Sequence, residues 1–288
     1  MDLEQTRIVV QKALDLGINL FDTADVYGGA GKSEEFLGEV LGPRRKDILI
    51  PTQFGHRMDD SGTREGASPQ YIRKAVEDSL SRLKTDTIDL YQLHTPDKNT
   101  PILETLETLS KLVLSGKVRY IGCSNLPAWQ VTDAHWLSVT RGHSGFVSCQ
   151  DEYSLLNRDV EKELLPMAEH FGLGILPYFP LASGLLTGKY KQGEALPEGT
   201  RFAKSQGMVD RYMTLANWDK VNKLDAFAQA AGHTLLDLAF GWLLRKSAVS
   251  SVIAGATKPD QLEANVKAAG WKLSPEKVAK VDEILNGG

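Results

Sequence analysis

The chain has 288 residues, of which 42% are hydrophobic and 24% charged, and its formal net charge at pH 7 is -4. This is the composition of a soluble globular protein, and the charge gives no electrostatic basis for binding nucleic acid or an anionic membrane. No apolar run reaches the roughly 20 residues that span a bilayer, and the polar, acidic N-terminus does not resemble a signal peptide. We therefore expect a cytoplasmic protein.

Short apolar strands alternate with helical patterns along the whole chain. The expected strands cover residues 20–21, 47–54, 88–94, 118–125, 146–151, 174–179 and 251–255. The expected helices cover residues 6–16, 35–41, 69–83, 101–116, 127–139, 159–171, 220–231, 234–245, 259–269 and 275–285. Ser33 stands just ahead of the second helix, and Ser68-Pro69 is a helix-start signal for the third. The segment 186–216 has no clean period and is expected to be a loop with short helical pieces.

This alternation, with no hairpin turns between strands, predicts parallel βαβ units. Many such units in a row favour a closed barrel over an open sheet, and we expect one domain over residues 1–288. No Gly-x-Gly-x-x-Gly run follows a strand, so a Rossmann domain is not supported.

Cys123 and Cys149 are the only cysteines, and both lie in strand-like runs. They could therefore lie on neighbouring strands. Reduced core thiols are favoured over a disulfide in a chain with no export signal.

An acid and a phenol mark the end of the first strand. Asp22 falls where strand 20–21 ends, and Tyr27 follows in a loop before Gly28 and Gly29. The carboxyl ends of strands are where α/β folds place their chemistry. The alternative is a capping Asp and a packed Tyr.

Four runs of the sequence resemble the signatures of the aldo-keto reductase family. They are Gly-Ile-Asn-Leu-Phe-Asp-Thr-Ala-Asp-Val-Tyr-Gly at 17–28, Asp-Leu-Tyr-Gln-Leu-His at 89–94, Gly-Cys-Ser-Asn at 122–125 and Pro-Leu-Ala-Ser-Gly-Leu-Leu-Thr-Gly-Lys at 180–189. The resemblance implies a (β/α)8 TIM barrel. Family members usually begin with a hairpin and a first barrel strand, whereas about seven strands are expected here. This favours a truncated chain or a misassigned start over a barrel that closes differently.

The family's catalytic group consists of an Asp, a Tyr, a Lys and a His. By resemblance Asp22, Tyr27 and His94 match it, whereas Gln53 stands where the family has its Lys. An ammonium lowers the pKa of a neighbouring phenol, and a glutamine supplies only a dipole. We expect depressed turnover and an Asp22 carboxylate that tends to take up a proton. The alternative is that His94 is the working acid and Gln53 positions the substrate. His56 has no motif support and is interpreted as a loop residue.

The resemblance also implies a site for NADPH. The residues that match the family's cofactor contacts are Ser124, Asn125, Gln150, Tyr178, Leu181, Ser183, Gly184, Leu186, Lys189, Gly255, Thr257, Lys258, Gln261 and Asn265. Ser124, Asn125 and Gln150 would hold the nicotinamide carboxamide, and Tyr178 would stack on the nicotinamide, unless it is a core aromatic. The preference for NADPH rests mainly on Lys258 before a helix N-terminus, a place that favours anions. A solvated loop lysine is the alternative.

These features predict an NADPH-dependent oxidoreductase that reduces aldehydes or ketones, with a small-molecule carbonyl substrate and no metal. The alternative is a weak or inactive NADP(H)-binding protein with a regulatory or scaffold role.

Overall fold

A computed structural model describes residues 1–287, which divide into two compact units. The first comprises Met1–Gln150, Pro166–Gly174 and Ala256–Pro259. Of the described residues, the second comprises Asp151–Leu165, Ile175–Gly255 and 260–287. The single barrel domain expected from the sequence stays a prediction.

A parallel sheet forms the centre of the first unit. Its strands are β1 (Pro51–Phe54), β2 (Ile88–Leu93), β3 (Val118–Ser124) and β4 (Phe146–Glu152), which pair in this order. Gln53 lies beside Gln92, which lies beside Gly122, and Ser124 lies beside Gln150. The strands therefore end along one edge of the sheet.

The segment around Asp22 extends this pairing beyond β1. The Phe21 backbone N–H donates to Leu49 O (3.0 Å), and the Asp25 N–H donates to Gln53 O (3.0 Å). Leu20 forms the single bridge of this segment, with Leu49. The expected strand at 20–21 is thus an irregular extended segment that runs parallel to β1.

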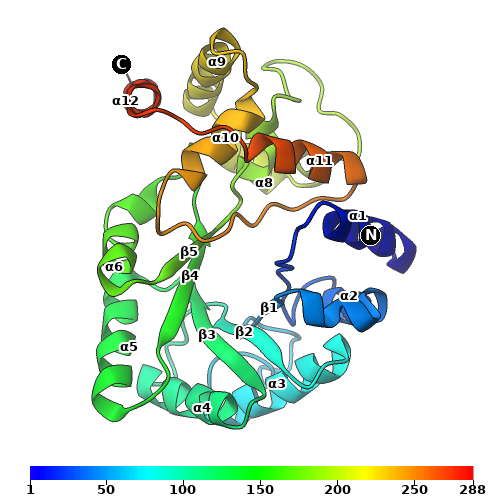
Figure 1. The fold of residues 1–288 in the computed structure, drawn as a ribbon, viewed down its shortest axis with the longest axis vertical. Helices are drawn as coiled ribbons and strands as arrows, with labels where there is room; N and C mark the ends of the chain where they lie inside the picture. The colour runs from blue at the N-terminus through cyan, green and yellow to red at the C-terminus, as the bar shows by residue number, and fades with distance from the viewer. Residues whose placement is uncertain (288) are drawn as a thin grey trace. The chain divides into compact units, whose positions relative to one another are not determined.

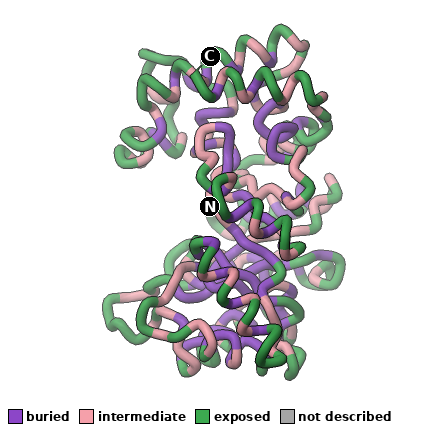
Figure 2. Tube along the Cα trace, turned by 90° about the vertical axis from the view of Figure 1, so that its left-hand side faces the viewer, coloured by how far each residue is buried: buried purple, intermediate pink, exposed green. Residues whose placement is uncertain are grey.

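Helices cover the sheet of the first unit, as Figure 1 shows for α3, α4 and α5. These helices are α1 (Leu3–Asp15), α2 (Lys32–Leu41), α3 (Pro69–Leu83), α4 (Ile102–Leu114) and α5 (Ala128–Arg141), and the short 3₁₀ helix η1 covers Gly42–Asp47. α3 packs on β1 and α4 on β3. Most strand residues and the inward faces of the helices are buried, with Tyr120 in β3 and Val147 in β4 as exposed exceptions, and Figure 2 draws buried segments in purple.

The helix-start signal at Ser68 is confirmed, because its hydroxyl accepts a hydrogen bond from the Tyr71 N–H. The start expected at Ser33 is wrong. Gly31 caps α2 and Ser33 lies inside the helix, where it bonds to the Thr23 hydroxyl (2.8 Å).

Several segments of the second unit differ from expectation. The helix expected over 159–171 breaks into η2 (Asp159–Glu161) and α6 (Leu164–Phe171), and α6 from Pro166 onward belongs to the first unit. The strand expected over 251–255 is not regular, although Val249 bridges Ile175 and the Ile253 N–H donates to Pro177 O (2.9 Å).

The other elements follow the expected order. They are β5 (Gly174–Tyr178), η3 (Ala182–Thr187), α7 (Arg201–Lys204), α8 (Gln206–Tyr212), α9 (Leu215–Ala230), α10 (Leu235–Leu244), α11 (Pro259–Ala268) and α12 (Pro275–Leu285). The segment 186–216 thus contains the expected short helical pieces.

The fold is α/β with a parallel sheet, as the alternation of elements predicted. Closure of a barrel stays a prediction. Cys123 and Cys149 lie on neighbouring strands, as the sequence allowed, and are reduced thiols whose sulfur atoms lie 3.7 Å apart.

Candidate active site

The polar side chains expected to do chemistry gather at the carboxyl ends of the strands in the first unit. Asp22 lies in the segment beside β1, Gln53 in β1, His94 just after β2 and Gln150 in β4. Strand pairing puts these positions along one edge of the sheet, although they are far apart in the sequence.

Asp22, Gln53 and Gln150 form a closed triangle of hydrogen bonds. Gln150 Nε2 donates to Asp22 Oδ1 (2.7 Å), and Gln53 Nε2 donates to Gln150 Oε1 (2.8 Å). Gln53 Nε2 also lies 3.3 Å from Asp22 Oδ1 and 3.5 Å from Oδ2. The side chains that bond Asp22 in this triangle are thus two uncharged amides.

This environment raises the pKa of Asp22 to about 7, chiefly because burial disfavours the charged carboxylate. The bonds from Gln150 and Gln53 oppose the rise without cancelling it. Asp22 therefore takes up a proton at a higher pH than an exposed aspartate does. This agrees with the expectation that a carboxylate without a cationic partner takes up a proton.

His94 is buried and lies between two other rings. Its ring centroid is 5.6 Å from that of Tyr27 at an interplanar angle of 84°, and 4.2 Å from that of His56 at 76°. Burial, and secondarily His56, lower the pKa of His94 to about 3, so its imidazole is neutral at neutral pH. The Tyr27 side chain is 38% exposed, which leaves it open to a ligand from solvent.

His56 is a neighbour of the site that the sequence did not single out. The interpretation of His56 as a loop residue is confirmed for its backbone, which lies beyond β1, but its ring contacts His94. Burial lowers the pKa of His56 as well. Its position three residues after Gln53 was the only available sequence signal.

Ser124 and Asn125 connect His94 with Gln150. The Ser124 hydroxyl donates to the Gln150 backbone oxygen (2.6 Å). Asn125 Nδ2 donates to the His94 backbone oxygen and to Ser124 Oγ, at 3.0 Å each. The chain of contacts therefore runs from Tyr27 through His94, Asn125 and Ser124 to the triangle around Asp22.

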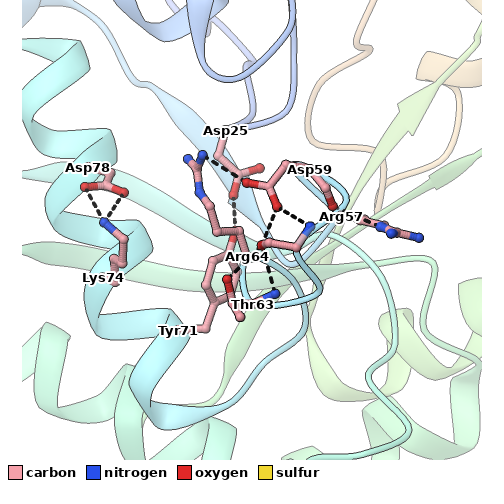
Figure 3. Close-up of polar contacts among 9 residues, drawn as sticks. Asp25, Arg57, Asp59, Thr63, Arg64, Tyr71, Lys74 and Asp78 are labelled. Carbon is pink, nitrogen blue, oxygen red and sulfur yellow. Dashed lines mark hydrogen bonds and ion pairs between the residues drawn. The ribbon is translucent and has the colours of Figure 1, made fainter.

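Asp25 anchors the loop that joins Asp22 to Tyr27. Its buried carboxylate accepts a hydrogen bond from the Tyr71 hydroxyl of α3 (3.1 Å), shown in Figure 3. Burial, with the nearby charge of Glu34 second, raises the pKa of Asp25 to about 7. The sequence reasoning missed this contact, although Asp25 lies inside the first motif.

The loop after β1 carries its own polar contacts, also drawn in Figure 3. Arg57 Nε donates to the Asp59 backbone oxygen (2.9 Å), and Arg64 pairs with the Asp59 carboxylate (3.4 Å). These contacts stabilise the loop that follows His56.

The remaining expected cofactor residues lie elsewhere in the chain. Thr257 and Lys258 belong to the short segment 256–259 of the first unit, directly before α11. The second unit contains Tyr178, Leu181, Ser183, Gly184, Leu186, Lys189, Gly255, Gln261 and Asn265. Tyr178 ends β5, and the residues from 183 to 186 lie in η3. The cofactor role of these residues stays a prediction.

The described residues contain neither a metal-binding cluster nor a helix that could span a membrane. Over residues 1–287, no group of three or more His, Cys, Asp or Glu side chains could hold a metal ion. Within the same range, every helix is too short or too polar to cross a membrane.

Known proteins are similar to this chain in sequence and in structure over nearly its whole length. A putative voltage-gated potassium channel subunit beta of Schizosaccharomyces pombe is 36% identical over 297 residues, covering 99% of this chain and 85% of the relative. The L-glyceraldehyde 3-phosphate reductase of Escherichia coli K12 is 34% identical over 297 residues, with the same coverage. The structure of the glycerol dehydrogenase AKR11B4 from Gluconobacter oxydans matches with a TM-score of 0.83 and 34% identity, covering 97% of this chain and 84% of that chain.

The family model described as "Aldo/keto reductase family" matches residues 1–286. Together with the shared fold and the relatives above, this match shows that the chain belongs to the aldo/keto reductase family.

Proposed function

We propose that the chain is an NADPH-dependent oxidoreductase that reduces aldehydes or ketones to alcohols, at a rate limited by Gln53. The observation that carries this proposal is the contiguous cluster of Asp22, Gln53, His94, Tyr27 and Gln150 at the strand ends. The names of two relatives, a glyceraldehyde 3-phosphate reductase and a glycerol dehydrogenase, support a small carbonyl compound or its alcohol as substrate.

Two side chains suit the proton side of such a reaction. A neutral His94 imidazole has an N–H that can polarise a carbonyl oxygen, and the exposed Tyr27 phenol has a proton to give. A phenol becomes a faster acid–base group when a neighbouring cation stabilises its anion. Gln53 brings no charge to stabilise its anion, so slow proton transfer follows.

The residues near Gln150 suit the carboxamide of a nicotinamide. The nicotinamide, when bound, supplies the hydride. The Ser124 hydroxyl and the amides of Asn125 and Gln150 include both donors and acceptors, as a carboxamide requires. The Gln150 amide makes one bond to Asp22 through Nε2 and one to Gln53 through Oε1, and each end keeps a second hydrogen or lone pair for a carboxamide. Lys258, before α11, is proposed to bind the 2′-phosphate of NADPH.

The proposal is tested by NADPH fluorescence on binding, followed by turnover with a reactive aromatic aldehyde in the same cuvette. Binding with slow consumption of NADPH is expected. Absence of any binding would overturn the nucleotide-dependent reaction.

Gln53→Lys is expected to raise kcat, by up to the ~10²–10⁴ that acid–base assistance contributes. The introduced ammonium stabilises a tyrosinate and also favours the ionised form of Asp22. Stopped-flow NADPH oxidation measures the gain, and Gln53→Met, of similar length without charge, is the control. Equal rates for the two variants would show that proton transfer is not limited by the missing cation.

A second candidate is an NADP(H)-binding regulatory protein, favoured by Gln53 in the catalytic cluster and by the potassium channel β subunits among the relatives. Tight NADPH binding without turnover, in both the wild-type chain and Gln53→Lys, would support this candidate. Turnover in the Gln53→Lys variant would instead favour the oxidoreductase over the regulatory protein.

A further inference from the structure

Four buried polar atoms, one of them on Gln53 and three on neighbouring strand residues, have no hydrogen-bond partner among the described residues. They are Gln53 Oε1, Gln92 Nε2, Gln92 Oε1 and Ser148 Oγ. The exposed fractions of these side chains are 0% for Gln53 and Gln92 and 5% for Ser148. Buried polar groups in folded proteins are nearly always bonded to protein or to ordered water. An amide and a hydroxyl bonded to nothing would therefore be exceptional.

These atoms lie close to one another because of the register of the sheet. Gln53, Gln92 and Gly122 form one row across β1, β2 and β3, so their side-chain positions point to the same face. A Cβ added to Gly122 would lie 2.7 Å from Ser148 Oγ and 3.2 Å from Gln92 Oε1. The Cα of Gly122 therefore faces the polar atoms of both neighbouring strands.

We propose that Gln53, Gln92 and Ser148 form a buried hydration site against Gly122, which fixes the side-chain amide of Gln53 with its N–H groups toward Asp22. Water both donates and accepts, and a buried water typically makes about three hydrogen bonds. The Gln92 N–H donates to it, the two amide oxygens accept from it, and the Ser148 hydroxyl does either.

The hydration site explains which end of Gln53 faces the carboxylate. An ionised Asp22 only accepts, so it requires the Nε2 end of Gln53. That orientation turns Oε1 away from Asp22, where only a donor such as water can satisfy it. The Gln53 Nε2 bond to Gln150 Oε1 holds the amide in the same orientation, so loss of the water weakens that orientation without abolishing it. The reversed amide brings its oxygen against Asp22 and favours the protonated acid. Gln92 and Ser148 are therefore positioning residues that act on Asp22 through Gln53.

The first test is a high-resolution crystal structure of the wild-type chain. An ordered water within hydrogen-bond distance of Gln92, Ser148 and Gln53 Oε1 is expected. Direct bonds among these side chains, with no water density, would overturn the proposal. This result does not depend on the proposed reductase activity.

The second test is the Ser148→Ala variant, read by a carbon-13 NMR titration of the Asp22 carboxyl group. Loss of one water ligand is expected to shift the Asp22 titration to higher pH, while Asp25 in the same protein stays unchanged. The control is Ser138→Ala, which removes an equally buried hydroxyl whose bond is to the His135 backbone oxygen. An unmoved Asp22 in Ser148→Ala, or an equal shift in both variants, would contradict the positioning role.

Gly122→Ala supplies an independent variant, because its methyl group would occupy the position facing Ser148 and Gln92. Gly122 has no positive φ, so alanine causes no backbone strain there, although Ser148 Oγ, 2.7 Å from the added Cβ, would have to move. The water is expected to be displaced and Asp22 to titrate at higher pH than in the wild type. A retained water with an unchanged titration would overturn the inference even if Ser148→Ala failed to fold.

Discussion

At the scale of single residues, the site keeps a carboxyl group where its ionised form is disfavoured. The pKa of Asp22 is raised from 3.8 to about 7 by burial, against two amide hydrogen bonds. Between pH 3.8 and about pH 7, Asp22 therefore holds its proton in the folded protein and releases it in the unfolded chain. Stability from this group is present below about pH 4 and is lost as the pH rises toward 7.

Asp22→Asn is expected to stabilise the protein at pH 8, because no buried charge remains to be solvated. The advantage over the wild type should shrink as the pH falls from 7 to 4, where Asp22 becomes protonated in the folded protein. Urea unfolding at several pH values measures this trend. Asp59→Asn is the control of opposite sign, since the pKa of the exposed Asp59 is lowered, first by its bond from the Ser61 side chain. A pH-independent effect of Asp22→Asn would contradict the raised pKa.

At the scale of elements, α2 and α3 pack closely together, and their contact extends to β1 next to the candidate site. Glu34 in α2 accepts hydrogen bonds from Arg82 of α3 (2.7 Å) and from Thr52 in β1 (2.5 Å). Thr52 directly precedes Gln53, so this buried ion pair stabilises the carboxyl end of β1, where the candidate site lies. Gly38 permits the approach, because a Cβ there would lie 2.3 Å from the Arg82 backbone oxygen.

Gly38→Ala is expected to destabilise the protein by roughly 1–3 kcal/mol, the usual cost of overpacking, despite the better helix propensity of alanine. Urea unfolding measures the change. The matched control is Gly207→Ala in α8, where an added Cβ meets nothing within 4 Å. That control is expected to be neutral or stabilising by up to about 1 kcal/mol. Equal effects of the two substitutions would show that the contact between α2 and α3 is loose.

At the scale of the whole molecule, a ligand that binds only the folded state adds to the free energy of unfolding, by about 2.7 kcal/mol at a ligand concentration of 100 times its Kd. This added stability raises the Tm. NADPH is expected to raise the Tm more than NADH at equal concentration, because Lys258 is proposed to bind the 2′-phosphate.

Lys258→Ala should narrow this difference in Tm, whereas Lys223→Ala, an exposed lysine on α9, should leave it unchanged. Differential scanning fluorimetry gives both values. An unchanged difference in Lys258→Ala would remove the basis for assigning the phosphate to this residue.

The sequence alone determined the order of most helices and strands and the family. Helix signals such as Ser68-Pro69 act within one turn, so they are visible in a few neighbouring residues. The motif around Asp22 and Tyr27 and the substitution at Gln53 were equally visible, because each depends on residue identity at a position. Ser33 and residues 159–171 were misassigned, since the side-chain partner of Ser33 and the turn that breaks the helix at Lys162–Glu163 come from the folded chain.

Only the tertiary structure decided how the site residues bond. The amide of Gln150 reaches Asp22 across 128 positions of sequence, and that of Gln53 reaches Gln150 across 97. The contacts of His56 with His94 and of Tyr71 with Asp25 are likewise made by strands and helices brought together in the fold. The physical reason is that burial and hydrogen-bond partners, which set the protonation of Asp22, depend on distances in space that residue order does not contain.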